Sequence, residues 1–149
     1  MTTIAWDGRT LAGDTYGTLG PTIMRVVPKI RRLSNGGLIG ASGTFTISAQ
    51  WMKWMEHGGD RPTIIADGDH IAGIEIKPNG EIWHHERNGS FQIAGNHHAI
   101  GSGSGFALGA LFMGADAKTA VAAAAQYDPY TGGEITLLEL NEAMLMAAE

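Results

Sequence analysis

The sequence contains no cysteine. This absence excludes disulfide bonds, thiolate catalysis and zinc sites built on thiolates. No hydrophobic run reaches the length of a membrane span, and the first residues lack the basic and apolar regions of a signal peptide, so we expect a cytoplasmic protein. With 10 basic residues, 15 acidic residues and a net charge of -5, binding to nucleic acid or to an anionic membrane has no electrostatic support.

The composition that is present indicates a folded globule. Of the 149 residues, 44% are hydrophobic and 17% are charged, which is enough apolar material to bury a core. The length and the absence of an internal repeat or linker predict a single domain over residues 1–149. The 22 glycines indicate tight turns between compact elements.

Hydrophobic periodicity and turn residues divide the chain into strands and helices. The pattern predicts extended segments at residues 2–6, 10–14, 22–33, 38–41, 63–66, 71–76, 81–85 and 134–140. It predicts helices at residues 44–56, 105–113 and 117–127, the last with Asp116 as its N-cap. Because strands and helices are grouped rather than alternating, we expect an α+β fold with antiparallel sheets.

Two polar features suggest sites that we rank low. The adjacent pairs His84-His85 and His97-His98 point to opposite faces of a strand, so neither pair chelates one metal easily, and exposed histidines are the favoured interpretation. The segment GSGSG at 101–105 opens a predicted helix, and such glycine-rich turns can hold phosphate. It lacks the Lys-Ser/Thr of a P-loop, so a nucleotide-binding or anion-binding module ranks last among the functions considered.

The N-terminal residues offer a stronger chemical possibility. Removal of Met1, which is usual before a small residue, would leave Thr2 with a hydroxyl and a free α-amine. The α-amine has an unperturbed pKa of about 7.7–8.0, so it can act as a general base near neutral pH. A threonine with its own amine is a known nucleophile and base unit. The alternative is that Thr2 and Thr3 only begin a β-branched strand.

Other residues favour the catalytic interpretation. Lys29 lies in a largely apolar segment, and a nearby cation would lower the pKa values of the threonine amine and hydroxyl. Asp14 ends the second predicted strand and can pair with that lysine. Gly43, at a turn from strand to helix, can present a backbone N–H to an oxyanion.

Four segments together carry a resemblance to a known family. They are TTIAWDGRTLAGDT from residue 2, KIRRLSNGGLIGASG at 29–43, AIGSGSGFALGAL at 99–111 and YDPYTGG at 127–133. With these segments in this order, the chain resembles the proteasome β-subunit and HslV peptidase family of N-terminal-nucleophile hydrolases. The resemblance implies a four-layer αββα sandwich. It also implies a threonine peptidase or amidase that forms an acyl-enzyme ester at Thr2.

The resemblance assigns roles to individual residues of this chain. It implies a catalytic set of Thr2, Asp14, Lys29, Gly43, Ser102, Asp128 and Thr131. In this set Asp14 and Lys29 form a charge pair, Gly43 forms the oxyanion hole, and Ser102, Asp128 and Thr131 support the amine. The implied primary specificity pocket contains Val27, Arg31, Ala41, Phe45 and Ala49. Arg31 in that pocket hints at an acidic or polar preference. A small-cation site built from backbone carbonyls would involve Gln126, Pro129 and Gly132.

The same resemblance implies how the protein works with others. No cofactor is expected, the substrate is a peptide or an unfolded protein, and the chain assembles into a homo-oligomeric ring. No ATPase motif occurs in the sequence, so any ATP-dependent unfoldase would be a partner. Residues 57–63 leave no room for the second long helix that relatives carry, which puts the ring size in question. The remaining alternative is a catalytically inactive ring or scaffold subunit, as expected if Met1 is retained.

Overall fold

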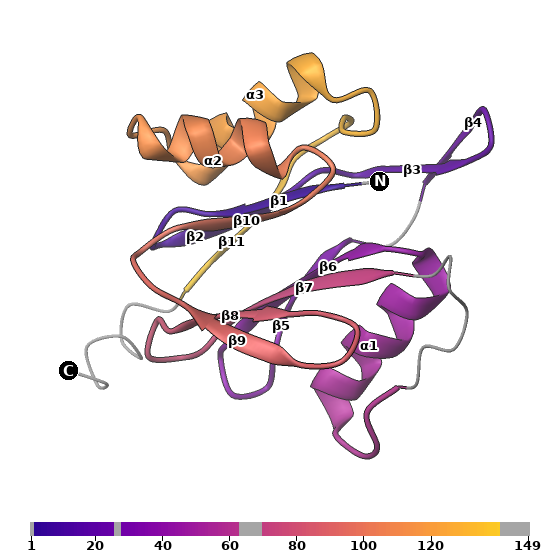
Figure 1. Cartoon of the computed structure of the whole chain (residues 1–149), viewed down its shortest axis with the longest axis vertical. Coiled ribbons are helices and arrows are strands. Elements are labelled where there is room, and N and C mark those ends of the chain that lie inside the picture. Colours follow the sequence, from indigo (N-terminus) through magenta and orange to yellow (C-terminus); the bar gives the residue numbers. More distant parts are fainter. Residues whose placement is uncertain (1, 26–27, 63–69, 141–149) are drawn as a thin grey trace.

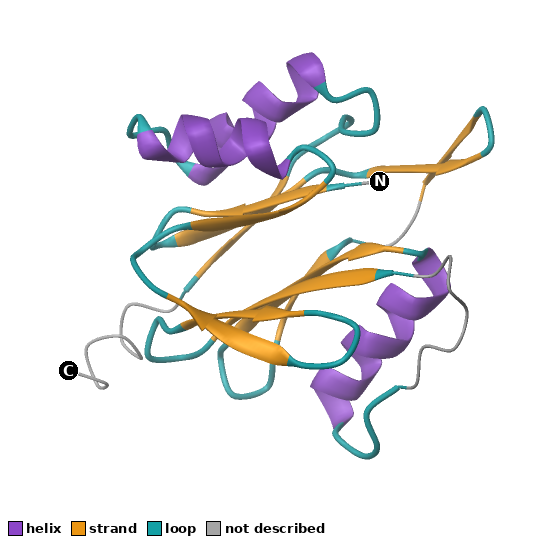
Figure 2. Cartoon of the chain, viewed as in Figure 1, coloured by secondary structure: helices purple, strands orange, loops and turns teal. Residues whose placement is uncertain are grey.

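Two antiparallel sheets lie face to face with helices on their outer sides (Figures 1 and 2). The structure of the protein is a computed structural model that describes residues 2–25, 28–62 and 70–140. Helices α2 and α3 cover one sheet and helix α1 covers the other, so the order of layers is α, β, β, α. The predicted α+β class and four-layer αββα sandwich are therefore confirmed.

The strands of the upper layer in Figure 1 come from both ends of the chain. Their spatial order is β10 (His98–Gly101), β1 (Thr3–Trp6), β2 (Thr10–Gly13) and β11 (Thr136–Glu139). Every neighbouring pair in this sheet is antiparallel, and β1 is a central strand. This topology places the N-terminal residues beside segments that follow them by about a hundred positions.

The lower layer is formed by the middle of the chain, again with antiparallel pairing. Its spatial order is β5 (Ile30–Arg32), β6 (Leu38–Gly43), β7 (Ile71–Ile76), β8 (Ile82–His85) and β9 (Ser90–Ile93). A separate hairpin of β3 (Tyr16–Leu19) and β4 (Thr22–Arg25) projects beyond the sandwich (Figure 1). The helices are α1 (Phe45–His57), α2 (Ser104–Phe112) and α3 (Ala117–Tyr127).

Successive side chains of a strand point to opposite faces of its sheet, so each inner strand contributes both to the core between the sheets and to the contact with the helices. In β1, Ile4 and Trp6 point into the core between the sheets, while Ala5 points toward α2 and α3. In β6, Leu38 faces the core between the sheets, whereas Ile39 faces α1. Because each of these strands is buried on both faces, it needs apolar residues at successive positions rather than at every second one.

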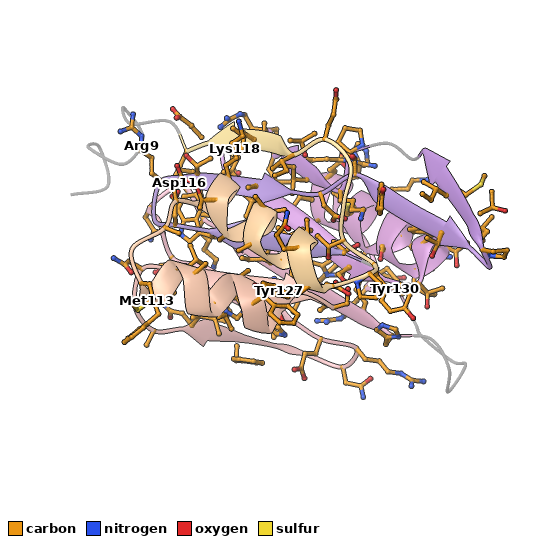
Figure 3. The ribbon with its side chains drawn as sticks, turned by 90° about the horizontal axis from the view of Figure 1, so that it is seen from above. Arg9, Met113, Asp116, Lys118, Tyr127 and Tyr130 are labelled. Atoms are coloured by element: carbon orange, nitrogen blue, oxygen red, sulfur yellow. The ribbon has the colours of Figure 1, made fainter. Side chains whose placement is uncertain are left out.

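The outer layers differ in the size of their side chains. The interface between the upper sheet and its helices is rich in alanine, with Ala12, Ala107 and Ala120 fully buried, so the helices can approach the sheet closely. Helix α3 begins at the predicted cap, because the Asp116 side chain accepts a hydrogen bond from the N–H of Thr119 at 2.8 Å (Figure 3). The interface beneath the lower sheet is filled by larger side chains of α1.

Several short strands were absent from the sequence prediction. Strands β3, β9 and β10 have four residues each, and their positions depend on pairing with neighbours more than on β propensity. The single extended segment expected at 22–33 divides into β4 and β5. The strand expected at 63–66 lies outside the described residues. Between α1 and β7, the described residues contain no second helix.

The prediction of exposed histidines is wrong for part of the set. His85 is buried beneath the lower sheet, where its Nε2 lies 3.0 Å from a carboxylate oxygen of Glu75. Half-buried His84 contacts His98 across the two sheets, with 2.8 Å between Nδ1 and Nε2. No group of three or more residues suited to hold a metal occurs in the described parts of the chain. None of the helices described is long and apolar enough to cross a membrane.

Candidate active site

Thr2 lies immediately before β1, buried at one end of the space between the layers. Its N–H lies 3.3 Å from the Oγ of Ser102. Pairing of β1 with β10, in which Thr3 is opposite Gly101, brings these distant residues together. Gly101 has a φ of +101°, and a Cβ atom there would lie 1.9 Å from the carbonyl oxygen of Thr2, so only glycine fits. The contact therefore depends on sheet register and on this glycine.

Asp14 and Lys29 form a buried ion pair beside the first strand. The pairing of β1 with β2 places Asp14, just after β2, next to Thr3. The carboxylate oxygen Oδ1 accepts hydrogen bonds from Lys29 Nζ at 2.9 Å and from the Thr3 N–H at 3.1 Å. Oδ2 accepts one from the Gly132 N–H at 3.1 Å. With three donors and no solvent-exposed surface, this carboxylate fixes the lysine in place.

Burial lowers the pKa of Lys29 from its ordinary value, because the ammonium group loses hydration. The negative charge and the hydrogen bond of Asp14 act in the opposite direction and raise it, but by less. Lys29 also lines the same pocket as Thr2. The pocket that Thr2 lines therefore also contains a lysine ammonium group whose pKa is lowered.

A second network continues from Ser102 to the far side of Thr3. Ser102 Oγ donates to Asp128 Oδ2 at 2.6 Å, and Thr131 Oγ1 donates to the same oxygen at 2.6 Å. The hydroxyls of Thr131 and Thr3 are 2.7 Å apart, and since Thr131 already donates to Asp128, Thr3 is the donor here. Tyr130 contributes its N–H to the other carboxylate oxygen at 3.1 Å. The network is a continuous chain of hydroxyl groups ending on one carboxylate.

The segment that carries Asp128 follows α3, between the exposed Tyr127 and Tyr130 (Figure 3). Burial, the largest single influence, raises the pKa of the Asp128 carboxyl. The hydrogen bonds from Ser102 and Thr131 and the N–H of Tyr130 lower it, and the net result is a pKa below the ordinary value. Asp128 is therefore ionised at neutral pH and acts as an acceptor.

A pocket of about 210 Å³ opens beside Thr2. It is lined by Thr2, Pro28, Lys29, Arg31, Ala41, Ser42, Gly43, Phe45, Ser48, Ala49 and Met52. Four of the five residues expected in a specificity pocket are in this set, and the fifth, Val27, lies outside the described residues. Gly43 ends β6 with a φ of +123°, and a Cβ atom there would lie 2.2 Å from the carbonyl oxygen of His70. Its backbone conformation therefore needs glycine.

One of the three expected cation-binding carbonyls, that of Gly132, has other partners. The carbonyl oxygen of Gly132 accepts hydrogen bonds from the N–H groups of Thr15 and Tyr16, both at 3.1 Å. Gln126 lies in the last turn of α3, and Pro129 is exposed. Because two donors already use the lone pairs of the Gly132 oxygen, that carbonyl is not available as a cation ligand, and we propose no cation site.

Some residues of the site were missed by reasoning from the sequence. Thr3 was assigned only a strand role, but its N–H binds Asp14 and its hydroxyl binds Thr131, so it links the two networks. Ser42, Ser48 and Met52 also line the pocket. Ser48 and Met52 could have been identified from their helical spacing relative to residues 45 and 49, because residues three or four apart share one face of a helix.

The chain resembles solved structures in its fold, but no family model and no curated protein matches its sequence. The structure is similar to BPH of Thiobacillus denitrificans, solved in complex with epoxomicin, with a TM-score of 0.71 and 20% identity over 95% of this chain and 100% of that one. It is similar to eukaryotic HslV from Trypanosoma brucei, with a TM-score of 0.70 and 21% identity over 93% of this chain and 99% of that one. The predicted resemblance to HslV is thus confirmed at the level of the fold.

Proposed function

We propose that this protein, which has the fold of HslV, is a threonine peptidase whose nucleophile is the Oγ of Thr2 after removal of Met1. The observation that carries the proposal is the convergence of two buried networks on the start of β1. One is the Asp14–Lys29 pair, and the other runs from Ser102 through Asp128 to Thr131. Buried polar networks of this kind cost stability unless they are fully satisfied, and they are typical of sites with a chemical task.

The proposed reaction begins with proton transfer from the Thr2 hydroxyl to the Thr2 amine, directly or through a water molecule. The oxygen then attacks the carbonyl carbon of the scissile peptide bond and forms a tetrahedral oxyanion. The N–H of Gly43 and the ammonium of Lys29 stabilise the negative charge. As the C–N bond breaks, the protonated Thr2 amine returns its proton to the leaving amine, and an ester remains on Thr2.

The second half of the reaction uses the same groups. The free amine of Thr2 takes a proton from a water molecule, which attacks the ester carbonyl. Collapse of this intermediate releases the carboxylic acid product and returns the proton to the threonine oxygen. Ser102, Asp128 and Thr131 hold the amine in position and compensate its positive charge while it is protonated.

We further propose that the pocket beside Thr2 receives the substrate side chain next to the scissile bond. Arg31, Ala41, Phe45 and Ala49 line it in the structure, and Val27 stays a predicted member. The substrate class is a peptide or an unfolded protein. The similarity of fold to HslV supports a homo-oligomeric ring that works in the cytoplasm, with an ATP-dependent unfoldase as a partner.

The first experiment measures the intact subunit mass and the native mass of the same preparation. We expect a subunit lacking Met1 in a multimer. Retention of Met1 in protein from its native host would contradict the peptidase assignment and leave the inactive ring subunit as the explanation.

The second experiment treats processed protein with a peptide epoxyketone or a β-lactone and maps the adduct by peptide mass analysis. Wild type should be labelled at Thr2, and Thr2→Ala should not be labelled. Thr46→Ala, which removes an exposed hydroxyl on α1, is the matched control and should be labelled like wild type. Equal labelling of wild type and Thr2→Ala, or none of processed wild type, would refute the mechanism.

A further inference from the structure

Helix α1 presents a stripe of residues that continues beyond the pocket. Phe45, Ala49 and Met52 line the pocket, and they follow one another at intervals of four and three residues. Glu56 comes four residues after Met52, so it lies on the same face of the helix one turn farther along. An acidic side chain therefore stands at the end of the helix face that forms the pocket wall.

Glu56 has a specific partner in that position. Its Oε1 forms a hydrogen-bonded ion pair with Nη1 of Arg31, which extends from β5 across the pocket wall. Only about a third of the Arg31 side chain and about a quarter of the Glu56 side chain are exposed, so the pair is shielded from water more than a surface pair would be. The guanidinium that lines the pocket already has an anionic neighbour.

The other cation of the pocket wall is also neutralised. Lys29 forms an ion pair with Asp14 at 2.9 Å, as described above. The remaining lining residues that face the pocket are apolar or carry hydroxyl groups. An acidic substrate side chain would lose its hydration without gaining an uncompensated cation, and a basic one would meet Arg31 and Lys29. An uncharged side chain avoids both costs.

We infer that the pocket selects an uncharged substrate side chain, and that Glu56 determines this specificity by neutralising Arg31. The inference rests on the proposed function and deepens it. Glu56 does not touch the reacting atoms. It is a positioning residue, because it acts through the guanidinium. Arg31 alone would suggest a preference for acidic substrate side chains, but its ion pair with Glu56 removes the basis for that preference.

The test uses four fluorogenic peptides that differ only in the residue before the scissile bond, which is Leu, Gln, Glu or Lys. With processed wild type, we expect kcat/KM for Leu and Gln to exceed that for Glu and Lys at least about tenfold. In Glu56→Gln the Glu peptide should gain about tenfold relative to the Gln peptide, mainly through KM, because Arg31 is no longer paired. The ratio of kcat/KM between the Leu peptide and the Gln peptide should stay unchanged.

Two control variants separate a charge effect from a structural one. Glu139→Gln removes an equal charge from an exposed position on β11 and should leave the relative kcat/KM values of the four peptides unchanged. Adding Arg31→Gln to Glu56→Gln should abolish the gain for the Glu peptide. Wild type that prefers Glu or Lys, or a Glu-to-Gln ratio unaffected by Glu56→Gln, would overturn the inference.

A binding experiment keeps the inference testable if the chemistry fails. Thr2→Ala retains the rest of the pocket, and non-cleavable amides of the four peptides can be titrated into it by NMR. Tighter binding of the uncharged peptides, with a reversal toward Glu in Thr2→Ala/Glu56→Gln, supports the pocket assignment even when wild type cleaves nothing. In that case the peptidase proposal fails and the selectivity stands. Equal binding of all four peptides overturns the selectivity.

Discussion

Replacement of Asp14 by asparagine should destabilise the fold far more than removal of the charge on its partner. Asp14 is completely buried and accepts hydrogen bonds from Lys29 Nζ and from the N–H groups of Thr3 and Gly132. Asparagine keeps the shape but has one acceptor oxygen, and its NH2 group faces donors. Asp14→Asn therefore leaves a buried ammonium without its anion and a backbone donor without an acceptor.

The magnitude follows from the burial of the pair. Removing one partner of a buried ion pair costs about 3–5 kcal/mol, because the other charge stays buried and uncompensated. In Lys29→Met the lysine charge disappears, and Asp14 retains two backbone N–H donors, so the loss should be about 1–2 kcal/mol. We therefore expect the free energy of unfolding to fall about 1–4 kcal/mol more in Asp14→Asn than in Lys29→Met.

Urea unfolding followed by tryptophan fluorescence measures this difference, since Trp6 and Trp51 are buried. Both variants and wild type are compared at one protein concentration, because association would contribute to stability. Under the proposed function both variants lose peptidase activity, but Lys29→Met does so with the smaller change in stability. A larger cost for Lys29→Met than for Asp14→Asn would refute this description of the pair.

The cost of Asp14→Asn should also depend on pH. Asp14→Asn removes the charge and weakens the hydrogen bond that raise the pKa of Lys29 against the effect of burial, so this pKa falls further. Above the lowered pKa the folded state releases the proton, while the unfolded lysine holds it up to about pH 10.4. The unfolded state then binds more protons, so stability rises with pH. The difference in free energy of unfolding between wild type and Asp14→Asn should therefore become smaller as the pH is raised from neutral to alkaline values.

Three further predictions concern other buried polar groups. Ser48→Ala should raise the free energy of unfolding by about 1 kcal/mol, because the buried Ser48 hydroxyl has no hydrogen-bond partner among the described residues and alanine favours a helix; a loss of stability in urea unfolding would contradict this. Thr131→Val should cost about 2 kcal/mol and slow the proposed peptidase, while Thr131→Ser keeps the hydroxyl bound to Asp128 and stays near wild type in both assays. His98 should titrate near pH 4 by NMR, because burial and then the neighbouring histidines lower its pKa to about 4. The unfolded chain takes up that proton near pH 6.5, so stability should fall as pH drops from 6.5 to 4, with a smaller slope in His98→Asn.

Much of the fold follows from local patterns in the sequence. The helices at 44–56, 105–113 and 117–127 are found within a residue or two of their predicted bounds, because periodicity and caps report local structure directly. Strand β10 was missed, since only Ala99 and Ile100 mark it and its remaining stability comes from pairing with β1. The predicted position of Lys29 beside Asp14 agrees with the structure, because Asp14 directly follows β2, Lys29 directly precedes β5, and these two strands contact each other.

The sequence by itself determined the α+β class, the order of the helices and of most strands, and the residue types that a threonine nucleophile requires. Only the tertiary structure decided which of these residues meet. Ser102 reaches Thr2 across a hundred positions through the register of β10 and β1. Thr3 joins two networks, and Glu56 neutralises Arg31 across the pocket wall. Periodicity reports which face of an element is buried, but contacts between distant faces depend on sheet order, register and packing, and these are properties of the whole fold.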